Sequence, residues 1–314
     1  MRKSLKIILL SCLILFVSVT AFAGEKYKFF VPLAESLADS SMAKLLSDMT
    51  KAMAEETGYD LEFHTFGYKP GCNVSKQVFE SLKKDEYQMS YMNAIEYVML
   101  RDQYEGVFEP MFTVTFDNKE YADLCMYVGA DSKIEKVEDT RGLVWGGPYT
   151  DHARLLLYEN GIDEPLSSFY SGVKYVDSTG VSSMIEKLDS GEIETFVGVK
   201  QHISMSGKES SSKNGQKKGP IYKEVYCTPY EHNWIFGFSN KVPKEVSRKI
   251  TSKIIKAHKD AKFNRFHFMF YAIKGHFVPF DEKNLQRTIE VAKLIKNQDW
   301  IKEREDLIKK SVGE

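Results

Sequence analysis

The chain has 314 residues, with 43 Lys and Arg against 44 Asp and Glu, which gives a formal net charge of −1. A balance this close to zero gives no electrostatic reason to bind nucleic acid, so we expect no nucleic-acid partner. The length exceeds one ordinary hydrophobic core and predicts two domains of moderate size.

The start of the chain has the pattern of an export signal. Three basic residues precede an apolar run over residues 7–22, which ends in Ala21-Phe22-Ala23. This pattern predicts a signal peptide over residues 1–23 that is cleaved before Gly24, and therefore a periplasmic or other extracytoplasmic location. Two alternatives are an uncleaved anchor helix, for which the run barely reaches the required length of about 20 apolar residues, and lipidation at Cys12.

Three cysteines remain after the predicted cleavage, namely Cys72, Cys125 and Cys227. Disulfides form in exported proteins, and an odd number of cysteines leaves at least one thiol free. None of the three has the CxxC spacing that is typical of zinc or redox sites. We therefore expect no metal or other cofactor, and the interpretation that we favour for Cys125 is a buried apolar residue.

Strand and helix patterns alternate along the rest of the chain. An apolar run over residues 27–31 is followed by Met and Leu residues at helical spacing up to Met53, and Gly58 is placed to end that helix. The further expected strands cover residues 61–66, 88–92, 111–116, 121–128, 143–146, 173–176, 195–199, 221–228 and 234–238, with helices over 74–82, 95–99, 151–160 and 181–188 and from Pro243 onward. This alternation predicts parallel sheets flanked by helices.

Pairs of consecutive strands near residue 120 and near residue 230 break the alternation and are placed to carry the chain out of one domain and back. The expected fold class is therefore α/β, with two βα lobes whose mixed, mainly parallel sheets are joined by two hinge strands. We expect residues 24–115 and 230–314 to form lobe 1 and residues 116–229 to form lobe 2. Two crossings allow the lobes to hinge and to close around a ligand.

The segment from Gln88 to Val98 is the clearest indication of function. Here a short strand runs into a helix through Tyr91 and Asn93. A strand end that meets a helix start presents unpaired backbone N–H groups, and open α/β sheets bind their ligands at such places. The segment therefore indicates a binding protein, with Tyr91 and Asn93 as ligand contacts.

Catalytic motifs such as HExxH, HxxEH and GxSxG do not occur, and neither does a Gly-rich nucleotide loop. We therefore do not expect an enzyme. The alternative is a metal-dependent secreted enzyme in which Asp151, His152, His202 and His232 converge on a metal ion. These residues come from separate segments, so this alternative is not favoured.

Several motifs follow one another in a characteristic order: Met53-Ala-Glu-Glu-Thr-Gly-Tyr-Asp60, the strand and Tyr-x-Asn loop over residues 88–97, Val137-Glu-Asp-Thr-Arg-Gly142, Gly161-Ile-Asp163 and Ser190-Gly-Glu-Ile-Glu194. In this order and spacing, over most of residues 26–290, the chain resembles the phosphate/phosphonate-type solute-binding proteins of ABC importers, which have the type II periplasmic binding protein fold. The resemblance implies a monomer that captures a small, anionic, phosphonate- or phosphate-like ligand and delivers it to an ABC permease in the cytoplasmic membrane. A ligand-sensing partner of a membrane receptor or sensor kinase is the alternative.

The resemblance also implies where the anion is held, because the family uses hydroxyls and backbone amides at the first helix of the second lobe. The matching residues are Tyr149, Thr150, Asp151 and His152. A carboxylate at Asp151 repels an anion unless Asp151 is protonated or paired. The alternatives are that Asp151 is the helix cap and that His152 is a surface residue of the first turn.

The family's aromatic contacts match Tyr68 and Tyr91, whose rings combine an apolar face with a hydroxyl. Ser178 and Thr179 precede a further helix, where hydroxyls and free amides bind anions. The alternatives are an ordinary loop aromatic for Tyr68 and plain helix capping for Ser178 and Thr179.

The sign of the ligand's charge depends on two further residues that the resemblance does not align. If Lys200 points into the site, the sequence favours an acidic ligand. If Glu231 points into the site, it favours an amine.

Overall fold

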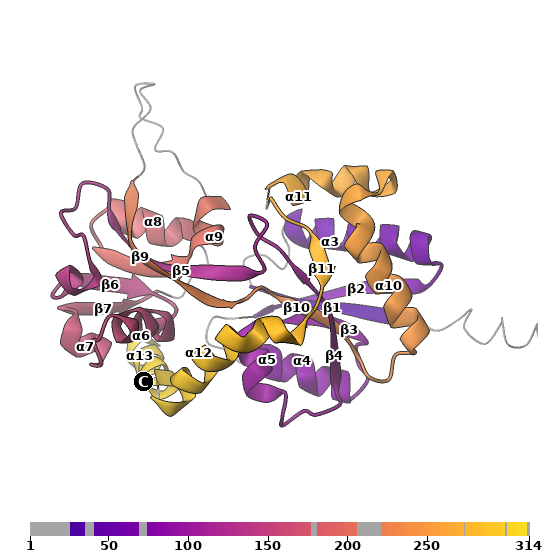
Figure 1. The fold of residues 1–314 in the computed structure, drawn as a ribbon, viewed down its shortest axis with the longest axis horizontal. Coiled ribbons are helices and arrows are strands. Elements are labelled where there is room, and N and C mark those ends of the chain that lie inside the picture. Colours follow the sequence, from indigo (N-terminus) through magenta and orange to yellow (C-terminus); the bar gives the residue numbers. More distant parts are fainter. Residues whose placement is uncertain are drawn as a thin grey trace, which may run out of the picture.

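The computed structural model describes residues 26–34, 41–68, 74–176, 181–205, 221–272, 274–298 and 300–312. Two α/β lobes lie side by side and are joined by extended strands (Figure 1). Among the described residues, no helix combines the length and the apolar character that a membrane span requires. The predicted signal peptide over residues 1–23 and the predicted loop over residues 206–219 lie outside the described residues.

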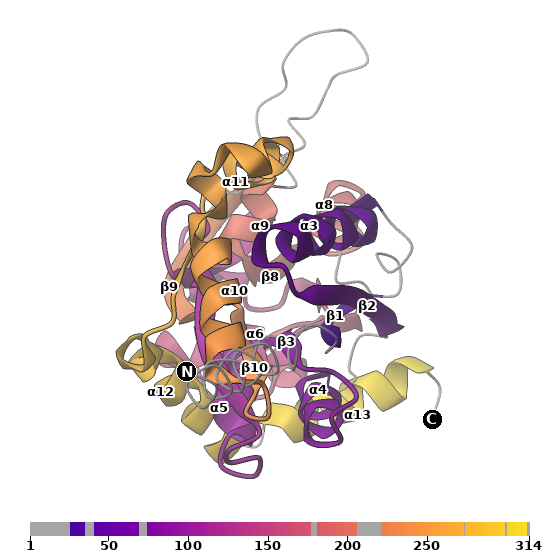
Figure 2. The same cartoon turned by 90° about the vertical axis from the view of Figure 1, so that its right-hand side faces the viewer.

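A six-stranded sheet forms the first lobe, in the order β11-β4-β10-β3-β1-β2. Its strands are β1 (Lys26–Ala34), β2 (Asp60–Tyr68), β3 (Met89–Met92), β4 (Phe108–Val114), β10 (Ile235–Ser239) and β11 (Phe277–Pro279). The helices of this lobe are α3 (Ser41–Thr57), α4 (Val74–Lys83), α5 (Ala94–Leu100), α10 (Lys244–Lys256) and α11 (His267–Ala272), with 3₁₀ turns at Ala257–Lys259, Ala261–Phe266 and Glu282–Leu285. Figure 2 shows α3 on one side of the sheet and α4 and α5 on the other.

Helix α3 shows how the sequence dictates these elements. Leu45, Met49 and Met53 recur at helical spacing and pack into the core of the first lobe. The helix ends where Gly58 adopts a φ of +73°, and the Gly58 N–H donates to the Ala54 carbonyl at 2.8 Å. Because this conformation is strained for other residues, Gly58 ends the helix, as predicted.

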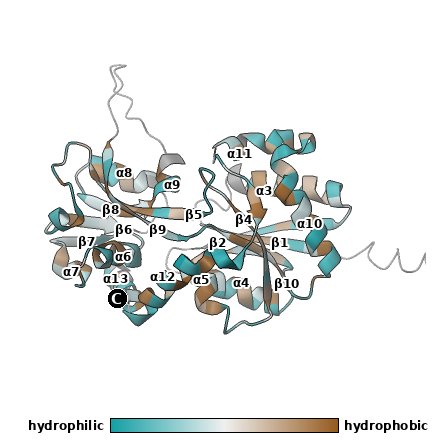
Figure 3. Ribbon diagram, in the orientation of Figure 1, coloured by the Kyte–Doolittle hydropathy of each residue, from teal (hydrophilic) through white to brown (hydrophobic). Residues whose placement is uncertain are grey.

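A five-stranded sheet forms the second lobe, in the order β7-β6-β8-β5-β9. Its strands are β5 (Tyr121–Gly129), β6 (Val144–Gly147), β7 (Gly172–Tyr175), β8 (Thr195–Val199) and β9 (Tyr222–His232). The helices are α6 (Thr150–Glu159), α7 (Leu166–Phe169), α8 (Val181–Asp189) and α9 (Lys200–Met205), with a 3₁₀ turn at Val137–Thr140. Colouring by hydropathy shows both apolar and polar residues around the helices of the two lobes (Figure 3).

Both sheets are mixed, as predicted, but the expectation that they are mainly parallel is wrong. Of the nine strand pairs among the described residues, four are parallel and five are antiparallel. The parallel pairs are the ones that helical crossovers connect. The antiparallel pairs involve the strands that pass between the lobes and the late strand β11, because these strands enter the sheets from the opposite end.

The chain crosses between the lobes from β4 to β5 and from β9 to β10, as predicted (Figure 1). The first crossing turns at Asp117 and Asn118, which have φ values of +51° and +59°. Asp and Asn tolerate this left-handed conformation better than most residues do. A bridge between Phe116 and Lys119 closes the turn.

The C-terminal helices α12 (Gln286–Asn297) and α13 (Trp300–Val312) extend from the first lobe to the second. Helix α12 packs against α5, β9 and α6, and α13 packs against α6 and β7. Trp300 is fully buried in the core that contains Trp145 and Leu155 of the second lobe. Residues 300–312 therefore lie on the second lobe, although the sequence placed residues 230–314 with the first. The remaining predicted boundaries stay a prediction.

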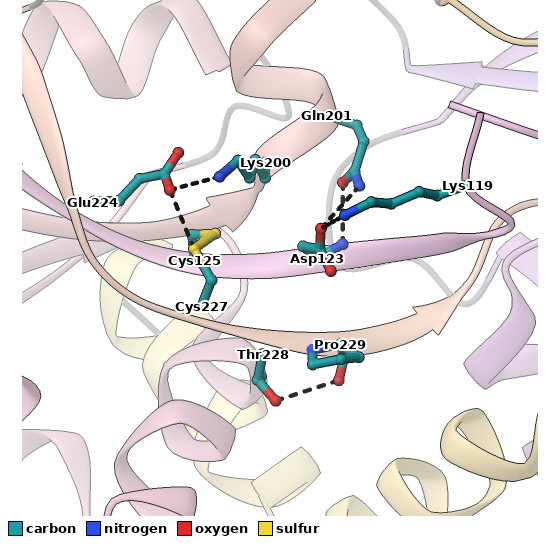
Figure 4. Close-up of a disulfide and its surroundings, with 9 residues drawn as sticks. All are labelled: Lys119, Asp123, Cys125, Lys200, Gln201, Glu224, Cys227, Thr228 and Pro229. Atoms are coloured by element: carbon teal, nitrogen blue, oxygen red, sulfur yellow. Dashed lines mark hydrogen bonds and ion pairs between the residues drawn. A yellow bond between two sulfur atoms is a disulfide. The ribbon is translucent and has the colours of Figure 1, made fainter. Parts of the chain in front are cut away.

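A disulfide joins Cys125 on β5 to Cys227 on β9 (Figure 4). The two residues are 102 positions apart in the chain and lie directly opposite each other in the antiparallel register. Cys125 is fully buried, as predicted, but it is also disulfide-bonded, because strand pairing brings together two residues that spacing alone does not connect. Cys72 lies outside the described residues.

Candidate functional site

The carboxyl ends of the parallel strands in one lobe face the carboxyl ends of those in the other. Strand β5 enters the second lobe from the first, and β8 runs antiparallel to β5, so β8 and its parallel neighbours β6 and β7 point back toward the first lobe. The first turns of α5 and α6 follow the ends of β3 and β6. The starts of α5 and α6, which the sequence predicts as binding elements, therefore lie at the edges of the two sheets that face each other.

Tyr91 belongs to an aromatic cluster of the first lobe. Its ring centroid lies 5.5 Å from that of Trp234 and 5.4 Å from that of Phe236. Its hydroxyl donates to the Pro32 carbonyl at 2.7 Å. The strand-end position is as predicted. The sequence did not predict the aromatic neighbours Phe236 of β10 and Trp234 of the crossing before it, because the pairing of β3 with β10 joins residues about 145 positions apart.

Asn93 holds the start of α5 against β9. Its Oδ1 accepts from the Glu96 backbone N–H at 3.1 Å, which makes Asn93 the N-cap, and its Nδ2 donates to Glu231 Oε1 at 2.9 Å. The Ile95 N–H donates to the other carboxyl oxygen, Glu231 Oε2, at 3.2 Å. Both ends of the Asn93 amide are thus engaged within the protein, which gives Asn93 a clear structural role.

Glu231 is buried with both oxygens bonded to the start of α5, whereas Lys200 pairs with Glu224, so neither condition for the sign of the ligand's charge decides it. Glu231 is 8% exposed, whereas the Lys200 Nζ lies 2.7 Å from Glu224 Oε2 on a half-exposed surface of the second lobe (Figure 4). Burial raises the pKa of Glu231 to about 8, although the hydrogen bonds from Ile95 and Asn93 oppose the shift. Glu231 is therefore mostly protonated at neutral pH, and its two oxygens are occupied by the start of α5.

Helix α6 begins without a side-chain cap. Its N-cap position is occupied by Tyr149, which makes no capping hydrogen bond. The alternative that Asp151 is the helix cap is therefore wrong, since Asp151 lies inside the first turn. Thr150 is fully buried, and its Oγ1 has no hydrogen-bond partner among the described residues. A buried, unpartnered hydroxyl beside uncapped helix N–H groups is a set of donors suited to an anion.

His152 is buried, so the alternative of a surface residue is wrong as well. The His152 ring stacks on the Tyr149 ring, with the centroids 4.6 Å apart, and meets the Tyr230 ring edge-on at 4.7 Å. Tyr230 lies at a register irregularity of β9, where the pairing with β5 shifts beside Ala122. A bulge of this kind re-aims a side chain, and here it places Tyr230 against His152.

Asp151 is ion-paired with Arg304, a residue that the sequence reasoning missed. Arg304 Nη1 on α13 lies 3.6 Å from Asp151 Oδ1. The charges of Asp151 and Arg304 both act on Glu96 of α5. Burial raises the pKa of Glu96. Asp151 is therefore paired, as an anion site at this position requires, and its partner lies 153 positions later in the chain. No local sequence pattern around Arg304 indicates this pairing.

The remaining predicted site residues cannot be placed. Tyr68 is the last residue of β2, and its side chain lies outside the described residues, as do Ser178 and Thr179. Their roles stay predictions.

The residues of the alternative metal site do not come together among the described residues. The His232 ring at the end of β9 is fully buried, its Nε2 faces Glu120 Oε2 of the first crossing at 3.3 Å, and it forms no ligand group with Asp151 or His152 among the described residues. The His202 side chain lies outside the described part. Within that part, one group of ligand type comes together, formed by Cys125, Glu224 and Cys227, and its two cysteines are joined in the disulfide.

The profile of a protein family, described as ABC transporter, phosphonate, periplasmic substrate-binding protein, matches residues 34–284. The chain belongs to this family. It is therefore a periplasmic substrate-binding component of an ABC transporter, and members of the family are transport binding proteins that act with a small-molecule ligand and an ABC permease. Among curated protein sequences there is no significant match.

Solved structures share the fold of this phosphonate-type binding protein at low sequence identity. A Xanthomonas citri protein bound to chloride ion is 14% identical, with a TM-score of 0.63 over 87% of this chain and 98% of that one. PhnD1 from Prochlorococcus marinus in complex with methylphosphonate is 13% identical, with a TM-score of 0.61 over 86% and 98%. A binding protein component of an ABC phosphonate transporter from Pseudomonas aeruginosa is 12% identical, with a TM-score of 0.62 over 92% and 96%. These similarities confirm the two-lobed type II fold.

Proposed function

We propose that the protein captures a small phosphonate- or phosphate-like anion between its lobes and delivers it to an ABC permease in the cytoplasmic membrane. The observation that carries this proposal is the start of α6, where the buried Thr150 hydroxyl has no described partner and the helix has no side-chain cap. A polar atom in this state costs free energy unless a ligand satisfies it. An oxyanion accepts hydrogen bonds from both the hydroxyl and the free N–H groups of the first turn.

The surrounding residues supply shape and selectivity. The stacked rings of Tyr149 and His152 lie beside Thr150 on α6, and Tyr91 and Trp234 present aromatic surface from the first lobe. Trp234 and Tyr149 are each 38% exposed, which is unusual for large aromatic side chains in this protein. Apolar walls around a few polar groups are typical of small-molecule sites. Tyr68, Ser178 and Thr179 are proposed as further contacts on the strength of the sequence.

Closure of the lobes completes the proposed mechanism. The two strand crossings act as hinges, and the ligand favours the closed form by the difference between its affinities for the closed and open forms. The permease then recognises the closed form. We expect X-ray scattering to show a smaller radius of gyration when ligand saturates the protein, and an unchanged value would contradict the hinge.

Calorimetric titration with methylphosphonate and inorganic phosphate tests the proposal. We expect binding of at least one probe, and Thr150→Val should weaken it by about tenfold to hundredfold because a hydrogen bond to a charged group is lost. Thr140→Val is the matched control, since Thr140 is also fully buried on the second lobe, but its hydroxyl donates to the Val137 carbonyl at 2.7 Å. Equal affinity in wild-type protein and the Thr150 variant would show that the anion binds elsewhere.

A further inference from the structure

The charge at the start of α6 is set by Asp151 and Arg304 together. Asp151 follows Thr150 directly and is 6% exposed, so its carboxylate is largely removed from solvent. Arg304 Nη1 approaches it at 3.6 Å from α13, with 31% of the Arg304 side chain exposed. Without Arg304, a buried negative charge would stand beside the place where the proposed anion binds. Arg304 therefore offsets a repulsion that the sequence of α6 alone would impose.

Further titratable groups from every neighbouring element face this pair. The charges of Asp151 and Arg304 act on the pKa of Glu96 on α5. The charges of Asp151 and Glu96 act on the pKa of Glu231 on β9. Burial raises the pKa of both glutamates, to about 8 for Glu231. Asp151 and Arg304 also act on Tyr230, whose ring meets the His152 ring, and the His152 ring stacks on Tyr149. Arg304 is the cation that pairs with Asp151, and it also acts on Glu96.

The groups described above leave little positive charge for a ligand at the start of α6. Arg304 is balanced by Asp151, and the groups that remain at the start of α6 are neutral donors, namely the Thr150 hydroxyl and the first N–H groups of the helix. A helix N-terminus acts as roughly half a positive charge. Such a site suits one negative charge, whereas a second charge would be repelled by the buried Asp151 carboxylate, whose partner Arg304 is already engaged in the ion pair.

On the basis of the proposed function, we propose that the site takes singly charged oxyanions in preference to doubly charged ones, and that Arg304 is the positioning residue that makes the start of α6 able to accept an anion. The ligand class is thereby narrowed to oxyanions that bind in the monoanionic form, such as a sulfonate or a phosphonate that has kept one proton.

Two probes of nearly the same shape separate charge from fit. Methanesulfonate carries one negative charge at every relevant pH, whereas methylphosphonate carries one in mildly acidic solution and two in mildly alkaline solution. We expect the Kd of methylphosphonate to rise by about tenfold or more relative to that of methanesulfonate when the pH is raised. Because a change in the protein's own charge acts on both probes, the ratio of the two Kd values isolates the ligand's own second charge.

Variants of the pair test the role of Arg304. Arg304→Gln should weaken methanesulfonate binding by about tenfold or more, Arg304→Lys should retain most of the affinity, and Asp151→Asn in the Arg304→Gln background should restore it. A merely structural arginine would not be rescued by removal of a carboxylate. Arg141→Gln is the matched control, because Arg141 pairs with Glu164 on the surface of the same lobe and should leave both Kd values unchanged.

Three outcomes would overturn the proposal. Methylphosphonate that binds more tightly than methanesulfonate in alkaline solution would refute the charge selection while leaving the proposed function intact. Full affinity in Arg304→Gln, with a melting temperature like that of the wild type, would refute the role of Arg304. Wild-type protein that binds neither probe nor phosphate would refute the charge selection and the anionic ligand together.

Discussion

The starts of α5 and α6 occupy equivalent places in the two lobes, but α5 has a side-chain cap and α6 has none. Helix α5 has an Asn93 cap whose amide is engaged with Glu96 and Glu231, so its donors and acceptors are used within the protein. Helix α6 has no side-chain cap, and the buried hydroxyl of Thr150 is left without a described partner. The difference teaches that position at a sheet edge does not by itself make a binding site. The lobe that leaves its donors unsatisfied is the one equipped to hold an anion.

The largest expected effect comes from a second contrast between the lobes, because a disulfide ties the second lobe alone among the described residues. The Cys125–Cys227 bond closes a loop of 102 positions. Reduction should lower the free energy of unfolding by about 4 to 5 kcal/mol, since the unfolded chain regains the entropy of that loop. Urea unfolding with and without a reducing agent measures this. Hydrogen exchange should then show protection lost in the second sheet and retained in the first, and a uniform loss would contradict the contrast.

The next effect is the pH dependence of stability that arises from Glu231, whose carboxyl group accepts hydrogen bonds from the start of α5. Its pKa in the folded protein is about 8, above the ordinary value of 4.5. Between these two values the folded state binds more protons than the unfolded state, so stability falls as the pH rises toward 8. We expect a slope of up to about 1.4 kcal/mol per pH unit from this group. Glu231→Gln should flatten the profile between pH 4.5 and 8, and an unchanged slope would mean that Glu231 stays ionised.

Removal of the α5 cap should cost somewhat less. Asn93→Ala loses a helix cap, typically about 1 kcal/mol, and leaves a carboxyl oxygen of the buried Glu231 without its donor, which costs a further 1 to 3 kcal/mol or so. Asn93→Ser should recover the capping part only, because its shorter side chain caps the helix but does not reach Glu231. Chemical denaturation of the three proteins measures both parts. If Asn93 instead binds ligand directly, affinity rather than stability will change most.

The smallest effect is expected at Thr150, and its sign is opposite. Thr150→Val keeps the shape of the side chain and removes a buried hydroxyl that has no described partner, so the ligand-free protein should be unchanged or more stable by about 1 kcal/mol. Thermal unfolding without ligand measures this. A clear loss of stability would show that the hydroxyl is satisfied within the protein and would make α6 resemble α5 after all.

Local chemistry accounts for what the sequence could predict. The end of α3 at Gly58, the two crossings between lobes and the turn from β3 into α5 follow from residues that lie next to one another in the chain. The pairing of Cys125 with Cys227, the contact between Asp151 and Arg304 and the hydrogen bond from Asn93 to Glu231 join residues more than 100 positions apart. These depend on strand register and helix docking, which a single sequence does not specify. The same limit explains why Asn93 was predicted as a ligand contact while its engagement with Glu231 went unseen.

The passage of α12 and α13 onto the second lobe gives the chain a third connection between its halves, and an odd number of connections leaves the first and last described residues on different halves. Strand β1 starts in the first lobe, whereas α13 finishes against α6 and β7. Closure around a solute should therefore change the separation between the ends. A pair of fluorophores, one near Lys26 and one near Val312, would report each opening and closing event without any label near the ligand.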